Sequence, residues 1–268
     1  MTLVQHSMMD VAPTVSAILR LPPPAQAKGR AIQEIASDFA DMRKLAILAP
    51  DAFGDFAWRL WQKEMPFLKS LHAKRSILLR SVMPSITPVN FATMVTGTDL
   101  AGHGINTFND NFKCETLFDV VRKAGLKSAG IGIEGYTGQK LLARSADIPG
   151  NAGNGTDDDV AKKVMEIASA HGPAFLIAQL GRVDDVFHKY GPSSPKVVPM
   201  LRETDARLRR LVMGLKPLGY AVIILADHGQ HDTVFVPLWR KNAVPGDGKN
   251  GSHGTDSPED CLVPCTWM

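Results

Sequence analysis

The chain contains six short apolar runs, each of strand length and each bounded by glycine, proline or charged residues. Runs of this kind are typical of strands that are buried on both faces of a sheet. They cover Lys44–Ala49, Ser76–Arg80, Ser128–Ile133, Ala174–Leu180, Tyr220–Ala226 and Leu262–Trp267. A sheet built from such strands needs helices on both sides, so the chain is restricted to a layered α/β architecture.

Helical patterns lie between these runs. They cover Phe53–Leu71, Glu115–Ala124, Asp157–Ala170 and Val197–Leu215. The alternation of strand and helix predicts a mostly parallel sheet, in which ligands lie beyond the carboxyl ends of the strands. With 268 residues, 44% of them hydrophobic, the sequence predicts a single domain over residues 1–268.

Composition excludes several classes of partner. Lys and Arg number 30 against 27 Asp and Glu, so a nucleic-acid polymer is not an expected ligand. No apolar run approaches the ~20 residues that a membrane span needs, and the first residues lack a signal-peptide pattern, so we expect a soluble cytoplasmic protein without a membrane partner. Cys114, Cys261 and Cys265 do not make a disulfide framework, and the last two are expected to pack inside a buried strand.

Thr87 offers a hydroxyl nucleophile in the segment 83–105. Pro88 suits the first position of a helix that ends at Thr96, so Thr87 is predicted to be the N-cap, beside free backbone N–H groups that favour an anion. Asn90 lies one turn along and is predicted to donate its side-chain amide to a phosphoryl oxygen held against Thr87. The alternative is an ordinary capped helix.

Acidic and imidazole side chains follow or precede the apolar runs at comparable positions. They are Asp51, Asp184, His188, Asp227, His228 and His253. Asp184 and His188 are four residues apart, so they share one face of a helical turn and can reach one ion. Such donors, together with the Thr87 hydroxyl, suit two divalent ions roughly 4 Å apart, which would activate the hydroxyl and neutralise a phosphoryl group. Imidazole-rich ligation favours Zn²⁺, with Mn²⁺ or Fe as alternatives.

Taken together, these motifs resemble a known family. MPSITPVNFATMVTG, HGI, DDVFHKYGP, ADHGQHD and GSHGTDSPED occur in the order seen in the alkaline phosphatase superfamily, most closely in its type I phosphodiesterase/nucleotide pyrophosphatase branch and the related phosphonoacetate hydrolases. The resemblance spans residues 44–264 and implies a three-layer α/β/α sandwich with a two-zinc site. It implies that Asp51, Thr87, Asp227 and His228 bind one metal, that Asp184, His188 and His253 bind the other, and that Asn90 contacts the phosphoryl oxygen.

The chain departs from the family pattern at two positions. Ala52 and Phe187 stand where the family usually has glycine, so the backbone there is expected to adopt a positive φ less freely. Asp185 is adjacent to Asp184, and only the four-residue spacing to His188 favours Asp184. Two further histidines stay outside the predicted ligand set: His103, expected to be a structural hydrogen-bonding residue, and His231, expected either to face the substrate or to have no part in the site.

The first residues resemble the carboxyl-terminal region of the family, so residues 1–43 are predicted to be a circularly permuted segment. The helix Asp10–Leu21 is then expected to pack beside the strand Leu262–Trp267, in place of the family's C-terminal helix, with the two termini close together. The alternative is that this segment is only an ordinary helix start.

The sequence therefore predicts a metal-dependent hydrolase of phosphate monoesters, phosphate diesters or phosphonates that acts on a small molecule through phospho-Thr87. Two alternatives remain: a phosphotransferase or mutase that uses the same phospho-threonine, and a non-catalytic metal-binding relative. The pocket rim is expected in residues 135–157 and 231–251. Phe112, Tyr136, Phe187 and Tyr190 are either stacking surfaces or packing residues, and packing is the expectation for each.

Overall fold

The computed structural model describes residues 6–233 and 250–268. Within them, eight strands form one sheet in the order β1-β3-β10-β7-β2-β6-β4-β5. The strands are β1 (His6–Ser7), β2 (Lys44–Pro50), β3 (Ser76–Arg80), β4 (Ser128–Gly132), β5 (Ile148–Asn151), β6 (Phe175–Leu180), β7 (Tyr220–Leu225) and β10 (Leu262–Trp267). Neighbouring strands are parallel except at β10, which is antiparallel to β3 and to β7. The six predicted runs all form strands, and the predicted mostly parallel sheet is confirmed.

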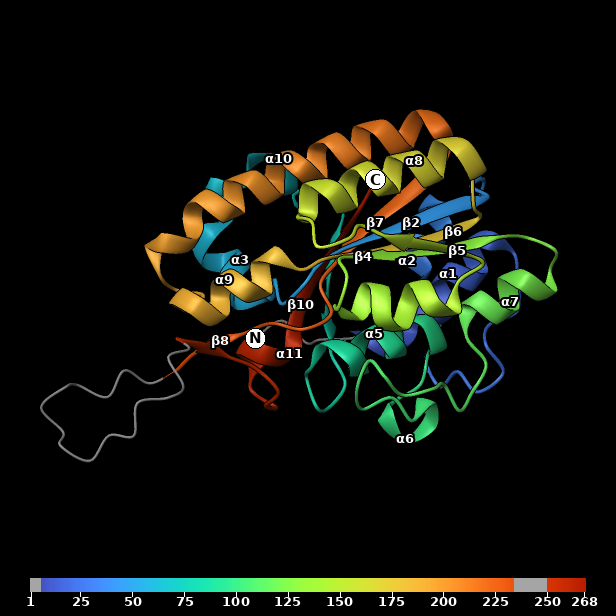
Figure 1. Ribbon diagram of the computed structural model, residues 1–268, viewed down its shortest axis with the longest axis horizontal. Coiled ribbons are helices and arrows are strands. Elements are labelled where there is room, and N and C mark those ends of the chain that lie inside the picture. Colours follow the sequence, from blue (N-terminus) through green and yellow to red (C-terminus); the bar gives the residue numbers. More distant parts are fainter. Residues whose placement is uncertain (1–5, 234–249) are drawn as a thin grey trace, which may run out of the picture.

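Helices cover both faces of the sheet, which gives the predicted three-layer sandwich (Figure 1). Helices α1 (Val11–Leu19), α5 (Thr87–Thr96) and α7 (Leu117–Lys123) lie on one face, and α8 (Asp157–His171) and α10 (Val198–Leu215) lie on the other. The remaining helices are α2 (Gln33–Asp38), α3 (Asp55–Trp61), α4 (Pro66–His72), α6 (Leu100–His103), α9 (Arg182–Tyr190), α11 (Pro258–Cys261) and a π-helix over Gly138–Ala143. None of the described helices is long and apolar enough to cross a membrane.

One predicted helix is divided in two. The pattern over Phe53–Leu71 forms α3 and α4, with a short 3₁₀ turn between them. Pro66 is the reason, because proline lacks a backbone N–H and clashes with the preceding turn, so it is accommodated at the start of a new helix.

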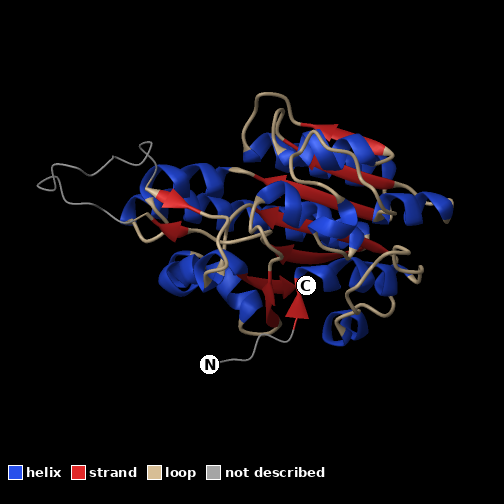
Figure 2. Ribbon diagram, turned by 90° about the horizontal axis from the view of Figure 1, so that it is seen from below, coloured by secondary structure: helices blue, strands red, loops and turns tan. Residues whose placement is uncertain are grey.

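The central strand β2 places the site. It pairs in parallel with β6 and β7, with Ala49 opposite Gln179 and Leu48 opposite Ile224. The carboxyl ends of the three strands therefore reach the same edge of the sheet, and the residues that follow them lie close together. A separate two-stranded sheet, β8 (His231–Asp232) with β9 (Gly251–Ser252), lies to one side of the main sheet in Figure 2.

The N-terminal helix packs mainly against elements other than the C-terminal strand. Helix α1 makes its main contacts with α5, α2 and β2, because its buried apolar side chains face the sheet and α5. Strand β3 lies between β1 and β10. It is α2 that reaches the C-terminal strand, where Trp267 donates its Nε1–H to Asp38 over 2.7 Å. Residues 1–5 lie outside the described part, so the proximity of the termini and the permutation stay predictions.

Candidate functional site

Two clusters of acidic and imidazole side chains lie at the carboxyl edge of the sheet. We call Asp51, Asp227 and His228 the inner cluster, and Asp184, His188 and His253 the outer cluster. Within each cluster, one ligand atom from each residue lies within 4.8 Å of those of the other two. The resemblance to the family had implied the same two groups for these six residues.

The local fold explains how each cluster forms. Asp51 follows β2 directly, and Asp227 and His228 follow β7 after one intervening alanine, so parallel pairing brings them together. Asp184 and His188 lie one turn apart on α9, with 3.3 Å between Asp184 Oδ1 and His188 Nε2. The two clusters are adjacent, since the rings of His228 and His253 stack with 4.1 Å between their centroids.

All three site histidines present the same ring nitrogen to the carboxylates. Their Nδ1 atoms lie 2.9, 2.9 and 3.1 Å from backbone carbonyl oxygens, for His188, His228 and His253 respectively. A carbonyl oxygen only accepts, so Nδ1 carries the proton and Nε2 is left with a free lone pair. This arrangement is the one that metal-binding histidines adopt, with the non-ligating N–H held by an acceptor.

The electrostatics of the inner cluster favour a cation. Burial, reinforced by the charges of Asp227 and Asp184, raises the pKa of Asp51 well above its ordinary value, and burial raises the pKa of Asp227 to about 7. In the described part of the chain, no Lys or Arg forms an ion pair with Asp51, Asp184 or Asp227. The Oδ2 atom of Asp227 is buried and accepts no hydrogen bond from the residues that the structure describes. Asp51 and Asp227, two buried carboxylates without a basic partner in the described ranges, are therefore stabilised in their ionised forms by a bound cation.

Burial also keeps two of the imidazoles neutral. It lowers the pKa of His228 below its ordinary value and the pKa of His253 to about 4. A neutral imidazole can donate its Nε2 lone pair to a metal ion at neutral pH. Together with the carboxylates, the donor set is one that Zn²⁺ accepts.

Thr87 adds a hydroxyl to the inner cluster. Its Oγ1 lies 3.1 Å from His228 Nε2 and 3.5 Å from Asp51 Oδ1. Helix α5 begins at Thr87 itself and its N-cap is Ile86, so the predicted N-cap position was wrong by one residue. The hydroxyl still lies at the positive end of a ten-residue helix, where negative charge is stabilised.

Asn90 has a different role from the predicted one. Its side chain is fully buried; Oδ1 accepts from the backbone N–H of Val82 over 2.8 Å, and Nδ2 donates to the carbonyl oxygen of Val82 over 3.1 Å. Both ends of the amide are therefore held by the segment before α5. The predicted contact with a phosphoryl oxygen is not supported by this geometry, because a side chain one turn into the helix leans back over the preceding loop.

A pocket of about 360 Å³ opens above Thr87. Its lining is Asp51, Thr87, Pro88, Asn106, Thr107, Phe108, Gly135, Tyr136, Thr137, Gln179 and Asp184. The expected rim over residues 135–157 contributes its first residues, whereas residues 106–108 were missed because nothing in their sequence marks them as a rim. Of the expected rim over residues 231–251, residues 234–249 lie outside the described part.

The candidate aromatic residues divide as follows. Phe187 is fully buried in the hydrophobic core, and Phe112 and Tyr190 are partly buried against that core. Tyr136 instead lines the pocket, where its hydroxyl donates to the carboxylate of Asp185, with 2.9 and 3.0 Å to its two oxygens. Asp185 is thereby engaged, which agrees with the choice of Asp184 as the cluster residue.

The two other histidines lie outside the clusters. His103 is buried and accepts the backbone N–H of Ile105 at Nδ1 over 3.0 Å, so its predicted structural role is confirmed. His231 lies 2.8 Å from Asp260 through Nδ1 and belongs to neither cluster.

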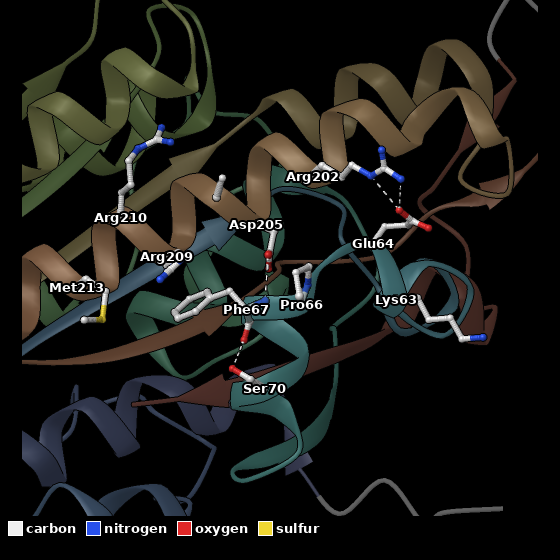
Figure 3. A pocket seen from close by; sticks show the side chains of 11 residues that line it. Lys63, Glu64, Pro66, Phe67, Ser70, Arg202, Asp205, Arg209, Arg210 and Met213 are labelled. Carbon is white, nitrogen blue, oxygen red and sulfur yellow. Dashed lines mark hydrogen bonds and ion pairs between the residues drawn. The ribbon is translucent and has the colours of Figure 1, made fainter.

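A larger hollow of about 1050 Å³ lies elsewhere, between α4 and α10 (Figure 3). Its acidic groups are already engaged: Asp205 accepts from the backbone N–H groups of Phe67 and Leu68, and Glu64 pairs with Arg202 over 2.7 Å. It contains no member of either cluster. The smaller pocket above Thr87 is therefore the candidate active site.

Comparisons of the sequence with known proteins show its family. The family model for type I phosphodiesterase / nucleotide pyrophosphatase matches residues 45–244. The venom phosphodiesterase of Macrovipera lebetinus is 28% identical over 221 residues, which are 69% of this chain and 25% of that protein. The venom phosphodiesterase of Naja atra is 28% identical over 228 residues, 70% of this chain and 26% of that protein. The chain thus spans about a quarter of the length of these relatives.

Solved structures share the fold. Human ectonucleotide pyrophosphatase / phosphodiesterase 5 superposes with a TM-score of 0.65 at 16% identity, over 84% of this chain and 87% of that one. Phosphonoacetate hydrolase from Sinorhizobium meliloti 1021, in complex with phosphonoformate, superposes with a TM-score of 0.56 at 19% identity, over 70% of this chain and 57% of that one. With three quarters of its length matched by the family model, the chain belongs to the type I phosphodiesterase / nucleotide pyrophosphatase family.

Proposed function

We propose that this chain is a metal-dependent hydrolase of phosphate esters or phosphonates, with Thr87 as the nucleophile and the two clusters as a dinuclear metal site. The observation that carries the proposal is the position of the Thr87 hydroxyl. It lies at the N-terminus of α5, within 3.5 Å of Asp51 and His228, and it faces the pocket.

Each cluster has the donors for one divalent cation, preferably Zn²⁺. The inner cluster would hold it through Asp51, Thr87, Asp227 and His228, and the outer cluster through Asp184, His188 and His253. When bound, the two cations would lower the pKa of the Thr87 hydroxyl and neutralise charge on the phosphoryl group. The unpartnered Asp227 Oδ2 and the free Nε2 lone pairs are the observations that favour this fit.

The chain's own residues supply the covalent steps. Thr87 loses its hydroxyl proton to solvent, and its Oγ1 forms a bond to phosphorus. The bond from phosphorus to the leaving oxygen of an ester, or to the leaving carbon of a phosphonate, breaks as that atom takes a proton from water. Water then attacks the phospho-threonine, the Oγ1–phosphorus bond breaks, and Thr87 regains a proton. The N-terminal N–H groups of α5 stabilise the negative charge that develops in both steps.

The substrate is proposed to be a small molecule, since the pocket holds about 360 Å³. The structural relatives support a phosphorylated or phosphonate ligand: an inactive form of murine ectonucleotide pyrophosphatase / phosphodiesterase 5 is solved in complex with AMP, and the bacterial phosphonoacetate hydrolase with phosphonoformate. A panel of one phosphomonoester, one phosphodiester and phosphonoacetate, each with added zinc or manganese, separates the three substrate classes.

The test of the nucleophile is Thr87→Ala with Thr87→Ser as its matched control. Alanine removes Oγ1, and turnover of a chromogenic phosphodiester should fall at least a thousandfold while bound zinc changes little, because the carboxylate and imidazole ligands remain. Serine restores a hydroxyl and should recover part of the rate. Full activity in Thr87→Ala would exclude Thr87 as the nucleophile.

A further inference from the structure

Two buried glutamines each contact a carboxylate of a different cluster. Gln179, near the end of β6, and Gln230, two residues after His228, are 2% and 1% exposed. Gln179 donates Nε2–H to Asp51 Oδ2 over 2.5 Å, and Gln230 donates Nε2–H to Asp184 Oδ1 over 2.6 Å. A carboxylate only accepts, which fixes the orientation of both amides.

Gln179 leaves the cluster-facing oxygen of Asp51 free. It bonds Oδ2, whereas Oδ1 is the atom that lies 3.5 Å from Thr87 and 3.6 Å from His228. The other end of the amide is also held, because Gln179 Oε1 accepts the backbone N–H of Gly138. Gly138 packs so closely that a Cβ there would lie 2.8 Å from the Cβ of Gln179. The glutamine is therefore fixed in the position that orients Asp51 toward the inner cluster.

Gln230 has the opposite relation to the outer cluster. The oxygen it bonds, Asp184 Oδ1, is the same one that lies 3.3 Å from His188 Nε2 and 3.7 Å from His253 Nε2. Its own Oε1 is buried and accepts no hydrogen bond from any residue of the described ranges 6–233 and 250–268. The amide is thus held at one end only, and it takes a lone pair of the oxygen that a cation in the outer cluster would use.

We propose that the two glutamines are positioning residues with opposite effects on cation binding: Gln179 strengthens the inner site by holding Asp51, and Gln230 weakens the outer site by competing for Asp184 Oδ1. This inference rests on the proposed dinuclear site. It makes the outer cation the more readily exchanged of the two, because its binding requires the amide of Gln230 to give up a hydrogen bond.

The test measures Co²⁺ affinity by calorimetry and by visible absorption in single-site backgrounds. His188→Ala leaves the inner cluster intact, and there Gln179→Met should lower the Co²⁺ affinity about tenfold to a hundredfold. His228→Ala leaves the outer cluster intact, and there Gln230→Met should raise the affinity, by about tenfold. Gln33→Met, on the exposed face of α2, is the matched control and should change neither value.

The two methionine variants are expected to change the Co²⁺ affinity in opposite directions, so the experiment can contradict the inference. Affinities within twofold of the background protein for both methionine variants, or a loss of affinity in both, would overturn the inference while leaving the dinuclear site in place. If the unaltered chain binds no Co²⁺, the proposed function itself fails. Where Gln179→Met shows no cooperative melting transition, Gln179→Asn replaces it, since its shorter side chain stays polar but cannot reach Asp51.

Discussion

The inner and outer clusters have similar donors but differ in their exposure to solvent. The inner residues Asp51, Asp227 and His228 are 2%, 0% and 0% exposed, whereas the side chains of Asp184, His188 and His253 are 17%, 21% and 15% exposed. Solvent screens charges in the outer cluster, while charges in the inner cluster interact through a medium of low dielectric.

Because of this difference, the ionisation of the carboxylates depends on a bound cation more strongly in the inner cluster than in the outer one. In the inner cluster, burial, reinforced by neighbouring carboxylate charge, favours the protonated carboxyl, as the raised pKa of Asp227, about 7, illustrates. A cation bound there must displace a proton, so metal binding and deprotonation are coupled. We therefore expect the inner site to show the steeper pH dependence of metal affinity.

The largest change in metal affinity is expected for Asp227→Asn, which tests whether the inner cluster depends on its buried charge. The amide keeps the contacts of the carboxylate, because Oδ1 can still accept from the N–H of Ala52 and Nδ2 can donate to His228 Nε2. The lost negative charge should lower Zn²⁺ affinity of the inner cluster more than about a hundredfold. The Zn²⁺ affinity can be measured by competition with a chromogenic chelator.

The same variant should stabilise the metal-free protein. The folded state holds the Asp227 proton more tightly than the unfolded chain does, so the free energy of unfolding falls as pH rises from about 4 to about 7. Asparagine cannot be deprotonated and so avoids this loss of stability. Urea unfolding at pH 8 should therefore show a gain in the free energy of unfolding on the order of 4 kcal/mol. Asp184→Asn, in the more exposed outer cluster, is the control, and an equal gain there would contradict the comparison.

His103 is a third buried histidine, and it lies outside both clusters. It therefore shows how burial changes the pKa of an imidazole without the neighbouring carboxylates of a cluster. Burial lowers the pKa of His103 to about 4, although among the described residues neither the inner nor the outer cluster includes it. In the unfolded chain the His103 imidazole binds a proton below about pH 6.5, whereas in the folded state it stays neutral down to about pH 4. The free energy of unfolding therefore falls as pH falls from about 6.5 to about 4. In His103→Gln this loss should shrink by roughly 2 kcal/mol, as measured by urea unfolding at pH 7 and pH 4.5. An unchanged loss would show that His103 does not carry it.

Tyr136→Phe tests whether the rim acts on the outer cluster alone. The change removes the hydrogen bond to Asp185, the neighbour of Asp184, and keeps the ring in the pocket. Affinity of the outer cluster for Zn²⁺ should fall about threefold, with the inner affinity unchanged. A larger effect on the inner cluster would show that the rim acts through Asp51 instead.

The sequence predicted the strands and the acidic residues that follow them because the two depend on one rule, whereas the division into two clusters was implied by the resemblance to the family. Apolar runs mark buried strands, and in a parallel sheet the polar residues after such strands converge, as Asp51 and Asp227 do. The spacing of Asp184 and His188 placed them on one helical face in the same way. The buried strands, the acidic residues that follow them and the spacing of Asp184 and His188 are local in sequence, so periodicity and spacing predict them.

The features that the sequence could not predict depend on contacts between distant segments. Asn90 was assigned to the ligand from its distance along the helix, but its partner is the backbone of Val82, which no spacing rule reveals. Gln179 looks like one more residue of a buried strand, and its role appears only when Asp51 and Gly138 are brought beside it. The packing of α1 against α5 likewise depends on the tertiary arrangement.

The smallest expected effect concerns the backbone beneath the inner cluster. Ala52 has φ of +62°, a left-handed conformation that costs an alanine about 1 kcal/mol and costs glycine little. Its N–H donates to Asp227 Oδ1 over 3.1 Å, so the strained conformation aims a donor at the cluster. Ala52→Gly keeps that donor, and relief of strain should offset the greater flexibility of glycine in the unfolded chain, leaving stability within about 0.5 kcal/mol. Ala57→Gly, in the helix α3, gains no such relief and should lose about 1 kcal/mol or more in the same urea titration. Equal losses in the two variants would mean that the positive φ at Ala52 costs the fold nothing, and that the family's glycine at this position serves some purpose other than backbone freedom.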